Sequence, residues 1–347
     1  MVHLTVVLAL LVLLASGCNH RVAPLEASVA PVARPLVIAH RGASGLLPEH
    51  TIEAYRLAIE QGADFIEPDL VITRDGVLVA RHENEISETT DVADHREFVS
   101  RRTTKSIDGK DVAGWFVEDF TLAELKTLRA RQRVASRDQS HNGRYTVPTF
   151  DEVLELALAE SKRLGRTIGV YPETKHPSYF QRIGKPLEEP LLASLRQVGW
   201  DRADAPVFIQ SFETGNLRTL AKQTRVPLVQ LIDAKGAPFG ESTTYADMLT
   251  PDGLREIAGY ARGIGPHKSL VLPLTGDGKP LAPTTLISDA HAAGLLVHPW
   301  TFRSDRPFLP AGFVHGQDEC RRFFSLGVDG VFSDFPDDAV AARRDAR

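Results

Sequence analysis

The chain has 347 residues, of which 43% are hydrophobic and 24% charged, and its formal net charge is -5 at pH 7. This composition is ordinary for a globular protein and supplies enough apolar side chains for a large core. The weakly acidic balance gives no sign of a nucleic-acid-binding surface, because such surfaces need clustered positive charge.

The first 17 residues have the pattern of a bacterial signal peptide. Leu4–Ala15 is apolar except for Thr5; it is too short to span a membrane as a mature helix and typical of a signal-peptide core. Residues 14–18 (LASGC) resemble the lipobox of bacterial lipoproteins, which implies cleavage before Cys18 and lipidation of its sulfur. We therefore expect an exported protein that is periplasmic or anchored to the envelope; a plain secretory signal is the alternative.

Residues 18–34 contain Pro24 and Pro31, several alanines and no hydrophobic period. This pattern predicts an extended tether between the signal peptide and the globular part. We expect the globular domain to cover residues 35–340 and a short tail to cover 341–347.

From residue 36 onward, apolar strands alternate with helical patterns. Eight strands separated by helices, over about 300 residues, favour a (β/α)₈ barrel of the TIM type. The rival is an open doubly wound sheet, but no glycine-rich phosphate-binding motif follows the first strand. The strands are expected at 36–40, 64–71, 167–173, 206–211, 226–232, 261–265, 294–300 and 328–333, and the helices at 51–61, 149–164, 186–198, 214–223, 251–260, 284–293 and 317–326.

A hairpin and an insertion interrupt this alternation after the second strand. Asp75 and Gly76 predict a tight turn into a hairpin strand at 77–82. Residues 83–147 are polar and lack a long apolar strand, so we expect a small inserted subdomain. One helix is expected within it at 121–130, where Thr121 and Glu124 have the spacing of a capping box.

Charged side chains gather at the ends of the expected strands, where barrel enzymes place their active groups. Residues two apart on a strand point to the same face, so two such charged residues present both of their side chains at one place. The gathered groups are His40 and Arg41 on the first strand, Glu67 and Asp69 on the second, His82 on the hairpin strand, and Glu173 and Lys175 on the strand at 167–173.

Three of these groups are acids that converge from two strands. Without compensation, Glu67, Asp69 and Glu173 would repel one another and raise each other's pKa. An all-oxygen ligand set suits a hard divalent cation, so we expect Ca²⁺ or Mg²⁺ rather than zinc. The alternative is a salt-bridge network in which Arg41 and Lys175 neutralise the acids.

The remaining groups suit acid–base and phosphate chemistry. His40 and His82 are expected to act as an acid and a base, because imidazole titrates near neutral pH. Arg41 would hold a phosphate through its planar fork, and Lys175 would do so as a point charge. Alternatively, Arg41 could only stabilise Glu67 and make no contact with a phosphate.

Two aromatic residues, Phe212 and Trp300, fall at later strand ends and could wall a substrate pocket. Packing at the barrel rim would explain each of them almost equally well. His50, His298 and Asp334 are candidates for supporting the active groups, and Arg303 and Asp305 are left without a role.

Several short motifs carry these residues. They are His40-Arg41-Gly42, residues 48–51 (PEHT), Glu67-x-Asp69, residues 73–76 (TRDG), His82, residues 172–175 (PETK), residues 298–305 (HPWTFRSD) and residues 333–336 (SDFP). Together they resemble the glycerophosphodiester phosphodiesterase family, most closely its periplasmic bacterial branch, over residues 36–340.

The resemblance implies a barrel, a Ca²⁺ ion, and hydrolysis of glycerophosphodiesters to sn-glycerol 3-phosphate and an alcohol. By matching position, it implies that the inserted segment 83–147 lies over the active face. Two positions depart from the family pattern: Glu83 stands after the histidine where aspartate is usual, and Pro68 lies between the two acids. The same matching makes Glu67, Asp69 and Glu173 the metal ligands, His40 and His82 the acid–base pair, and Arg41 a phosphate contact.

Two other functions remain as alternatives. One is a phospholipase that acts on intact lipid, and the other is a surface lipoprotein that binds a ligand or host partner without turnover. For the hydrolysis of glycerophosphodiesters, the expected partner is the small-molecule substrate; no nucleic acid is expected, and a membrane only through a lipid on Cys18.

Overall fold

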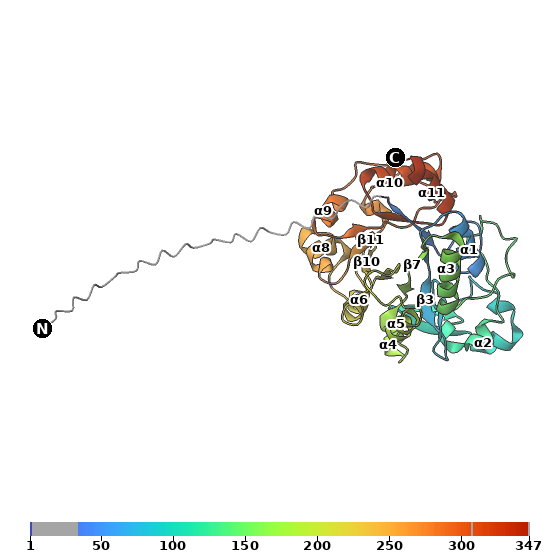
Figure 1. The fold of residues 1–347 in the computed structure, drawn as a ribbon. Coiled ribbons are helices and arrows are strands. Elements are labelled where there is room, and N and C mark those ends of the chain that lie inside the picture. Colours follow the sequence, from blue (N-terminus) through green and yellow to red (C-terminus); the bar gives the residue numbers. More distant parts are fainter. Residues whose placement is uncertain (2–33, 307, 346–347) are drawn as a thin grey trace. The chain divides into compact units, whose positions relative to one another are not determined.

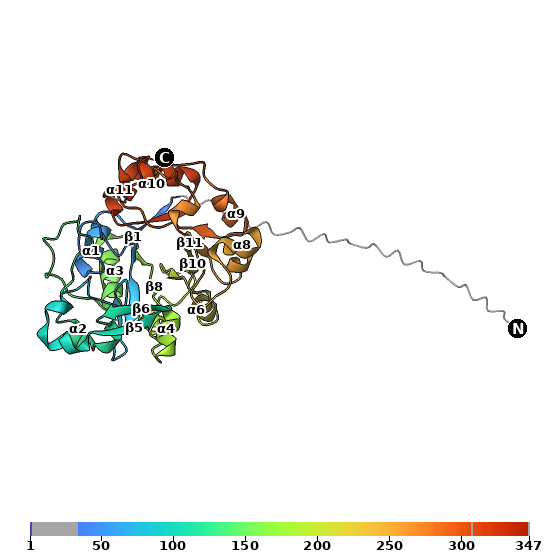
Figure 2. The same ribbon diagram turned by 180° about the vertical axis from the view of Figure 1, so that it is seen from behind.

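The computed structural model describes Met1 together with residues 34–306 and 308–345. Except for Met1, the expected signal peptide and the tether up to residue 33, including Cys18, lie outside the described residues. In residues 34–345, strands occupy the centre and helices surround them (Figures 1 and 2). Among the described residues, none of the helices is both long enough and apolar enough to cross a membrane.

The central strands form two sheets whose neighbours are parallel with one exception, the hairpin of β3 and β4. The first sheet has the order β13 (Gly330–Ser333), β1 (Leu36–His40), β2 (Phe65–Glu67) and β7 (Gly169–Val170). The second has the order β12 (Leu296–Val297), β11 (Gly263–Pro266), β10 (Leu228–Ile232), β9 (Ile209–Ser211), β8 (Glu173–Thr174), β3 (Asp69–Ile72) and β4 (Leu78–Ala80).

Single backbone hydrogen bonds connect the two sheets beyond the regular ladders. The segment after β12 bonds to β13 through Phe332 N to Pro299 O at 3.1 Å and Phe302 N to Phe332 O at 2.8 Å. On the other side, Val170 N donates to Pro206 O at 3.0 Å. All eight expected strand positions hold strands, and they follow one another in chain order, so the predicted (β/α)₈ barrel of the TIM type is confirmed.

Two of the expected strands are each split in two, which corrects the predicted ranges 64–71 and 167–173. Pro68 separates β2 from β3, and Pro172 lies between β7 and β8. Proline has no N–H to donate to a ladder, so the regular strand is interrupted at each proline. The two split strands still pair with each other in one register on both sides of the prolines, as Phe65 with Gly169 and Asp69 with Glu173. As a result, β2 and β7 belong to one sheet and β3 and β8 to the other.

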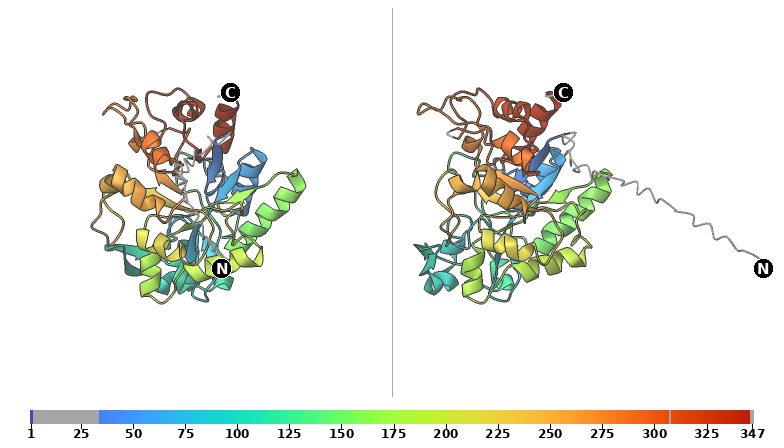
Figure 3. Two further views of the ribbon diagram at one scale, coloured as in Figure 1. Left: turned by 60° about the vertical axis from the view of Figure 1, so that its left-hand side comes forward. Right: turned by 90° about the vertical axis from the view of Figure 1, so that its left-hand side faces the viewer.

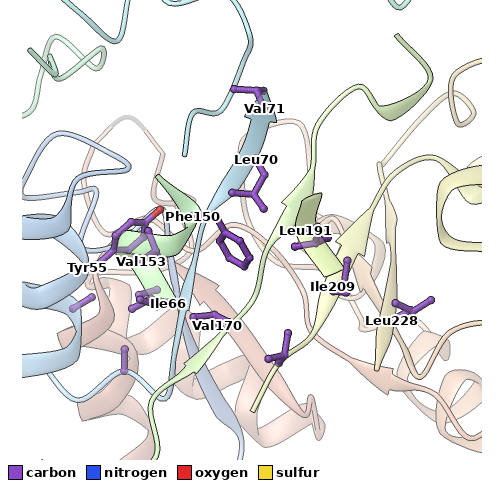
Figure 4. Close-up of a cluster of buried hydrophobic side chains, with 14 of the residues drawn as sticks. Tyr55, Ile66, Leu70, Val71, Phe150, Val153, Val170, Leu191, Ile209 and Leu228 are labelled. Carbon is purple, nitrogen blue, oxygen red and sulfur yellow. The ribbon is translucent and has the colours of Figure 1, made fainter. Parts of the chain in front are cut away.

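Side chains along β1 alternate between two apolar environments, as the pleat of a strand requires. Ile38 packs in the barrel interior with Tyr171, Val229 and Phe332. Val37 and Ala39 belong to the larger cluster between strands and helices. Figure 4 shows part of that larger cluster, in which Ile66 and Val170 face Tyr55 and Val153 from the covering helices. His40 has the parity of Ile38 and so ends the strand on the interior side.

The helices that cover the strands lie close to the expected ranges. α1 begins after Thr51, whose hydroxyl accepts from Ala54 N at 3.1 Å, and α3 begins at the capping box of Thr149 and Glu152. Figure 3 shows these helices around the strands. Their bounds are α1 (Ile52–Glu60), α3 (Phe150–Leu164), α5 (Glu188–Gln197), α6 (Thr214–Leu220), α8 (Pro251–Ala258), α9 (Leu286–Ala292) and α10 (Gly316–Leu326).

Three further helices were not predicted: α4 (Pro177–Arg182), α7 (Tyr245–Met248) and α11 (Pro336–Asp345). Helix α11 runs past residue 340, where we expected the domain to end. Its Arg343 bonds to Pro35 O at 2.9 Å and also pairs with Asp64. These bonds join the end of the domain to its beginning.

The segment 83–147 contains an antiparallel hairpin, β5 (Thr103–Ile107) and β6 (Lys110–Gly114), and several short helical turns: η1 (Val92–Asp94), η2 (Arg96–Arg101) and η3 (Val117–Asp119). The helix expected at 121–130 is only α2 (Leu122–Leu125), so that prediction was too long. It ends early because the hydroxyl of Thr127 donates a hydrogen bond to the carbonyl oxygen of Glu124 at 2.7 Å, and because Ala130 forms a β-bridge with Thr90.

Arg137 fastens this segment to the strand ends of the barrel. Its guanidinium donates to Asp334 Oδ2 at 2.6 Å, to Asp305 Oδ2 at 2.9 Å and to Ser44 O at 3.0 Å. All three acceptors belong to loops at the carboxyl ends of β1, β12 and β13. The insertion therefore borders the face where the charged groups gather.

Gly42, directly after Arg41, lies in the turn between β1 and α1, where a side chain would not fit. Its φ is +86°, and a Cβ there would lie 2.7 Å from the carbonyl carbon of Ala54. Gly76 has a similar φ of +85°, but a Cβ there would meet nothing within 4 Å. Left-handed backbone costs about 1–2 kcal/mol for a residue with a Cβ, and overpacking adds about 1–3 kcal/mol.

We therefore expect Gly42→Ala to lower the free energy of unfolding by about 1–3 kcal/mol more than Gly76→Ala. Urea denaturation of the two variants measures the difference. Equal losses would show that Ala54 does not restrict this turn.

Candidate active site

The strand register brings the charged groups together in pairs. His40 lies opposite Glu67 across β1 and β2, and Asp69 lies opposite Glu173 across β3 and β8. A carboxylate oxygen of each of the three acids lies within 4.8 Å of one from each of the others, and all three acids are buried. The three acids, called the acidic trio below, are thus as close as the sequence predicted.

The charge of the acidic trio is only partly compensated by cations. Arg41 Nε lies 3.2 Å from Asp69 Oδ2, His50 Nε2 lies 2.9 Å from the same oxygen, and Lys175 Nζ lies 2.9 Å from Glu173 Oε1. Glu67 is bonded to the amide of Gln210 and the backbone N–H of Arg41, at 3.1 and 2.8 Å.

The pKa values of the trio follow from these contacts. Burial and the neighbouring charge of Asp69 raise the pKa of Glu67 well above its usual range. Burial also raises the pKa of Glu173, although Lys175 opposes the shift. Arg41, Lys175 and His50 hold the pKa of Asp69 well below its usual range against the effect of burial. The salt-bridge alternative therefore accounts for Asp69 but leaves Glu67 without an ion pair among the residues that the structure describes.

The residues present fit a bound metal ion. The donors are carboxylate oxygens, which suit hard divalent cations. The side-chain carbonyl oxygen of Gln210 is also buried next to Glu67, with no hydrogen-bond partner among the described residues. The acidic trio is accordingly a candidate metal centre, with Gln210 beside it.

Arg41 sits in a left-handed backbone conformation with φ 60°, and its guanidinium reaches the centre of the site. Its Nη1 lies 3.3 Å from Glu49, a buried acid that also accepts from Arg133 at 2.8 Å. Arg41 and Arg133 lower the pKa of Glu49 in spite of its burial. Glu49 thus anchors both guanidinium groups from the side away from the cavity.

His40 is oriented by an acid on the last strand. Its Nδ1 lies 2.6 Å from Asp334 Oδ1, while Asp334 Oδ2 accepts from Arg137 at 2.6 Å and from Arg303 at 3.0 Å. When Nδ1 carries the proton, Nε2 is the acceptor of the ring. Burial and the charge of Arg41 lower the pKa of His40 to about 4, against the pull of Asp334.

Glu83, the residue after His82, places a carboxylate beside the ring, although His82 Nδ1 makes no well-aligned hydrogen bond among the described residues. His82 Nδ1 lies 3.0 Å from Glu83 Oε1, and the other oxygen of Glu83 lies 2.7 Å from His176 Nε2. His176 Nδ1 in turn lies 2.5 Å from Asp108, at the tip of the β5–β6 hairpin. Burial, Arg41 and Lys175 lower the pKa of His82 to about 3.

A cavity of about 320 Å³ brings these groups to one surface. Phe212 and Trp300 meet edge to face in its wall, with ring centroids 5.7 Å apart, and Trp300 Nε1 donates to Gly265 O at 2.7 Å. Asp69 lies buried beneath the cavity and does not line it. Of the residues predicted for the site, the lining contains His40, Arg41, Glu67, His82, Glu173, Lys175, Phe212 and Trp300.

Comparison with known proteins agrees with this geometry. The profile of the glycerophosphoryl diester phosphodiesterase family matches residues 40–338. The chain belongs to this family. It is 39% identical to glycerophosphodiester phosphodiesterase GDPD6 of Arabidopsis thaliana over 94% of this chain and 93% of that protein. It is 31% identical to a glycerophosphodiester phosphodiesterase of Haemophilus influenzae over 88% of each chain.

Solved structures of the family share the fold. A putative glycerophosphoryl diester phosphodiesterase from Silicibacter pomeroyi superposes with a TM-score of 0.65 at 22% identity, over 91% of this chain and 95% of that one. A phosphodiesterase from Oleispira antarctica, solved in complex with the product sn-glycerol-3-phosphate, gives a TM-score of 0.59 at 22% identity over 89% and 96%.

Several residues of this family member were not assigned roles from the sequence. Glu49 and Asp334 stand in the motifs at 48–51 and 333–336, so a signal existed, but Glu49 received no role and Asp334 only a general one. The only signal for Gln210 in the sequence is that a polar residue interrupts a buried strand. Arg133 and Arg137 lie in the insertion, where no periodic pattern marks them.

The acidic trio should bind calcium in a way that thermal unfolding can measure. A ligand at 100 times its Kd stabilises the folded state by about 2.7 kcal/mol, because it binds that state alone. We expect CaCl₂ to raise the Tm of the chelated wild-type protein by several degrees and Glu173→Gln to remove this rise. Glu319→Gln, which replaces a buried acid on α10, is the control and should keep it. A wild-type Tm that responds to neither calcium nor magnesium would contradict the metal centre.

His176 should make stability depend on pH. Although burial lowers its pKa, Asp108 and Glu83 outweigh that effect and raise the pKa to about 9, above the usual value of 6.5. Such a group contributes its full stability below pH 6.5 and loses it as pH rises through 9. We expect the Tm difference between wild type and His176→Gln to be largest near pH 6 and to vanish near pH 10.

The control for this titration is His95→Gln, which removes an imidazole lying between Asp91 and Glu97 in the insertion. A Tm difference between wild type and His176→Gln that stays constant from pH 6 to 10 would contradict the raised pKa of His176.

Proposed function

We propose that this protein hydrolyses glycerophosphodiesters to sn-glycerol 3-phosphate and an alcohol with the help of a divalent cation. The observation that carries the proposal is the meeting of two imidazoles, two cationic side chains and the acidic trio at one cavity, with Asp69 of the trio buried beneath it. Membership of the family and the product found in the Oleispira antarctica structure support it.

The cation that we propose for the trio is Ca²⁺, with Mg²⁺ as the alternative, because all the donors are hard oxygens. Glu67, Asp69 and Glu173 would hold it. When bound, such an ion supplies Lewis-acid polarisation of a phosphoryl oxygen.

The phosphate of the substrate would bind to Arg41 and Lys175. Both side chains line the cavity, and both are already held in place by acids behind them. Burial alone would lower the pKa of Lys175, but Glu173 and Asp69 raise it above the usual value, so Lys175 stays protonated. Two fixed positive groups stabilise charge as it develops on the phosphate oxygens.

The imidazoles would move the protons. With pKa values of about 4 and 3, His40 and His82 are neutral near pH 7 before substrate binds. One, in this neutral form, removes a proton from the nucleophile, which is water or the neighbouring glycerol hydroxyl. The other would take up a proton from solvent as the negatively charged phosphate binds beside it, and would then deliver that proton to the leaving alcohol. Asp334 behind His40 and Glu83 behind His82 stabilise an imidazolium when it forms.

The assay that tests the function is release of sn-glycerol 3-phosphate from glycerophosphocholine. We expect release with calcium, loss of release after chelation, and a loss of at least ~10²-fold in His40→Ala or His82→Ala. His291→Ala, on α9 away from the site, is the matched control. Binding of the diester without release would favour a non-catalytic protein, and turnover of phospholipid vesicles alone would favour a phospholipase.

We further propose that the protein is exported and carries a lipid on Cys18, on the strength of residues 4–18 alone. In a bacterial host, the wild-type protein should fractionate with membranes, and Cys18→Ala should be soluble. Mass spectrometry of the mature N-terminus is the direct measurement. An unmodified N-terminus at any other residue would contradict lipidation and leave a plain secretory signal.

A further inference from the structure

A second cavity adjoins the first on the side of the inserted hairpin. Its volume is about 520 Å³, and Glu173, Lys175, Phe212 and Asp233 line both cavities. Its other walls come from the β5–β6 hairpin, the start of α4 and the loops after β9 and β10. Whatever is bonded to a phosphate held by Arg41 and Lys175 therefore has an adjoining space to enter.

Aromatic rings form one side of this second cavity. Phe212 contacts Trp300 of the first cavity and, on its other side, Tyr245 of the second, with ring centroids 6.4 Å apart. Phe239, which is partly exposed, completes this side, and the guanidinium of Arg182 already lies over its ring, 5.5 Å from the centroid. Such ring faces attract organic cations.

Most charges in the walls are already paired. Lys175 pairs with Glu173, and His176 lies between Asp108 and Glu83. Lys110 is exposed at the edge of the hairpin.

Two acids of the second cavity, Glu213 and Asp233, have no ion-pair partner among the described residues. Glu213 is only 8% exposed, and it accepts from the backbone N–H and the hydroxyl of Ser178, each at 3.1 Å. Asp233 is exposed and accepts from Ala234 N at 2.6 Å.

The electrostatic state of Glu213 agrees with a missing cation. Burial and the charge of Asp108 raise its pKa to about 7, although the bonds from Ser178 oppose the shift. A positive group in the cavity would compensate this carboxylate. Neutral hydroxyl groups would supply hydrogen bonds but no charge.

We propose that the second cavity receives the alcohol part of the diester, and that Glu213 and Asp233 make the protein favour alcohols that carry an ammonium or trimethylammonium group over neutral polyols. This inference rests on the proposed hydrolysis of glycerophosphodiesters. It assigns the selectivity to two acids and an aromatic wall that stand beside the groups that carry out the reaction.

A structural role for Glu213 is the rival explanation, since it also caps the first turn of α4 through Ser178. Asp233 has no such role in the described part of the chain, where its exposed side chain bonds only to the next backbone N–H. The two residues therefore need to be tested both separately and together.

The test compares kcat/KM for four diesters: glycerophosphocholine and glycerophosphoethanolamine against glycerophosphoglycerol and glycerophosphoinositol. We expect the wild type to favour the first two, and we expect Asp233→Asn and Glu213→Gln together to lower that preference by about tenfold, roughly the effect of losing two partly exposed ion pairs. Asp233→Asn alone should lower it in part. Asp252→Asn removes an exposed acid on α8, outside both cavities, and should keep the wild-type preference.

The results separate this inference from the proposed function. A wild type that cleaves all four diesters, with a preference that the double variant leaves unchanged, overturns the inference and leaves the hydrolysis standing. A wild type that cleaves none of them overturns both. The side chain of Asp233 makes one local hydrogen bond, to Ala234 N, so Asp233→Asn should not disturb the fold. If a folded Asp233→Asn variant keeps the wild-type preference, Asp233 does not contribute to the selectivity.

Discussion

The repulsion between three buried carboxylates is the constraint on which the rest of this structure depends. Glu67, Asp69 and Glu173 have oxygens within 4.8 Å of one another, and burial makes their charges costly. Arg41 and Lys175 neutralise part of that charge, His50 adds a hydrogen bond to Asp69, and the remaining charge favours a divalent cation. The same arrangement leaves positive groups lining the cavity, where a phosphate can meet them.

The groups around the trio are held by contacts from distant parts of the chain. His40 is oriented by Asp334 from the last strand, and Asp334 is held by Arg137 from the insertion. His82 is backed by Glu83, which reaches the hairpin tip through His176 and Asp108. The insertion thus supports both imidazoles, which gives the segment a purpose beyond covering the barrel.

Much of this could be predicted from the sequence, because strand ends, capping residues and the spacing of Glu67 and Asp69 are local patterns. The barrel and the meeting of the acids followed from them. The split strands did not, since the effect of Pro68 and Pro172 depends on which neighbour each half pairs with. Helix 121–130 was too long because Thr127 and Ala130 bond elsewhere. Contacts such as Arg137 with Asp334 join residues 197 positions apart, and no local pattern encodes them.

The junction of Arg343 with Pro35 fixes the place where the rest of the polypeptide joins the domain. Residue 35 stands at the start of β1 and His40 at its end, so the two are separated by the length of the strand, about 16 Å at 3.3 Å per residue. The mouth of the barrel and residue 35 thus lie at opposite ends of β1, so the domain itself can be coupled to a solid matrix through its residue 34 without chemistry at the substrate entrance.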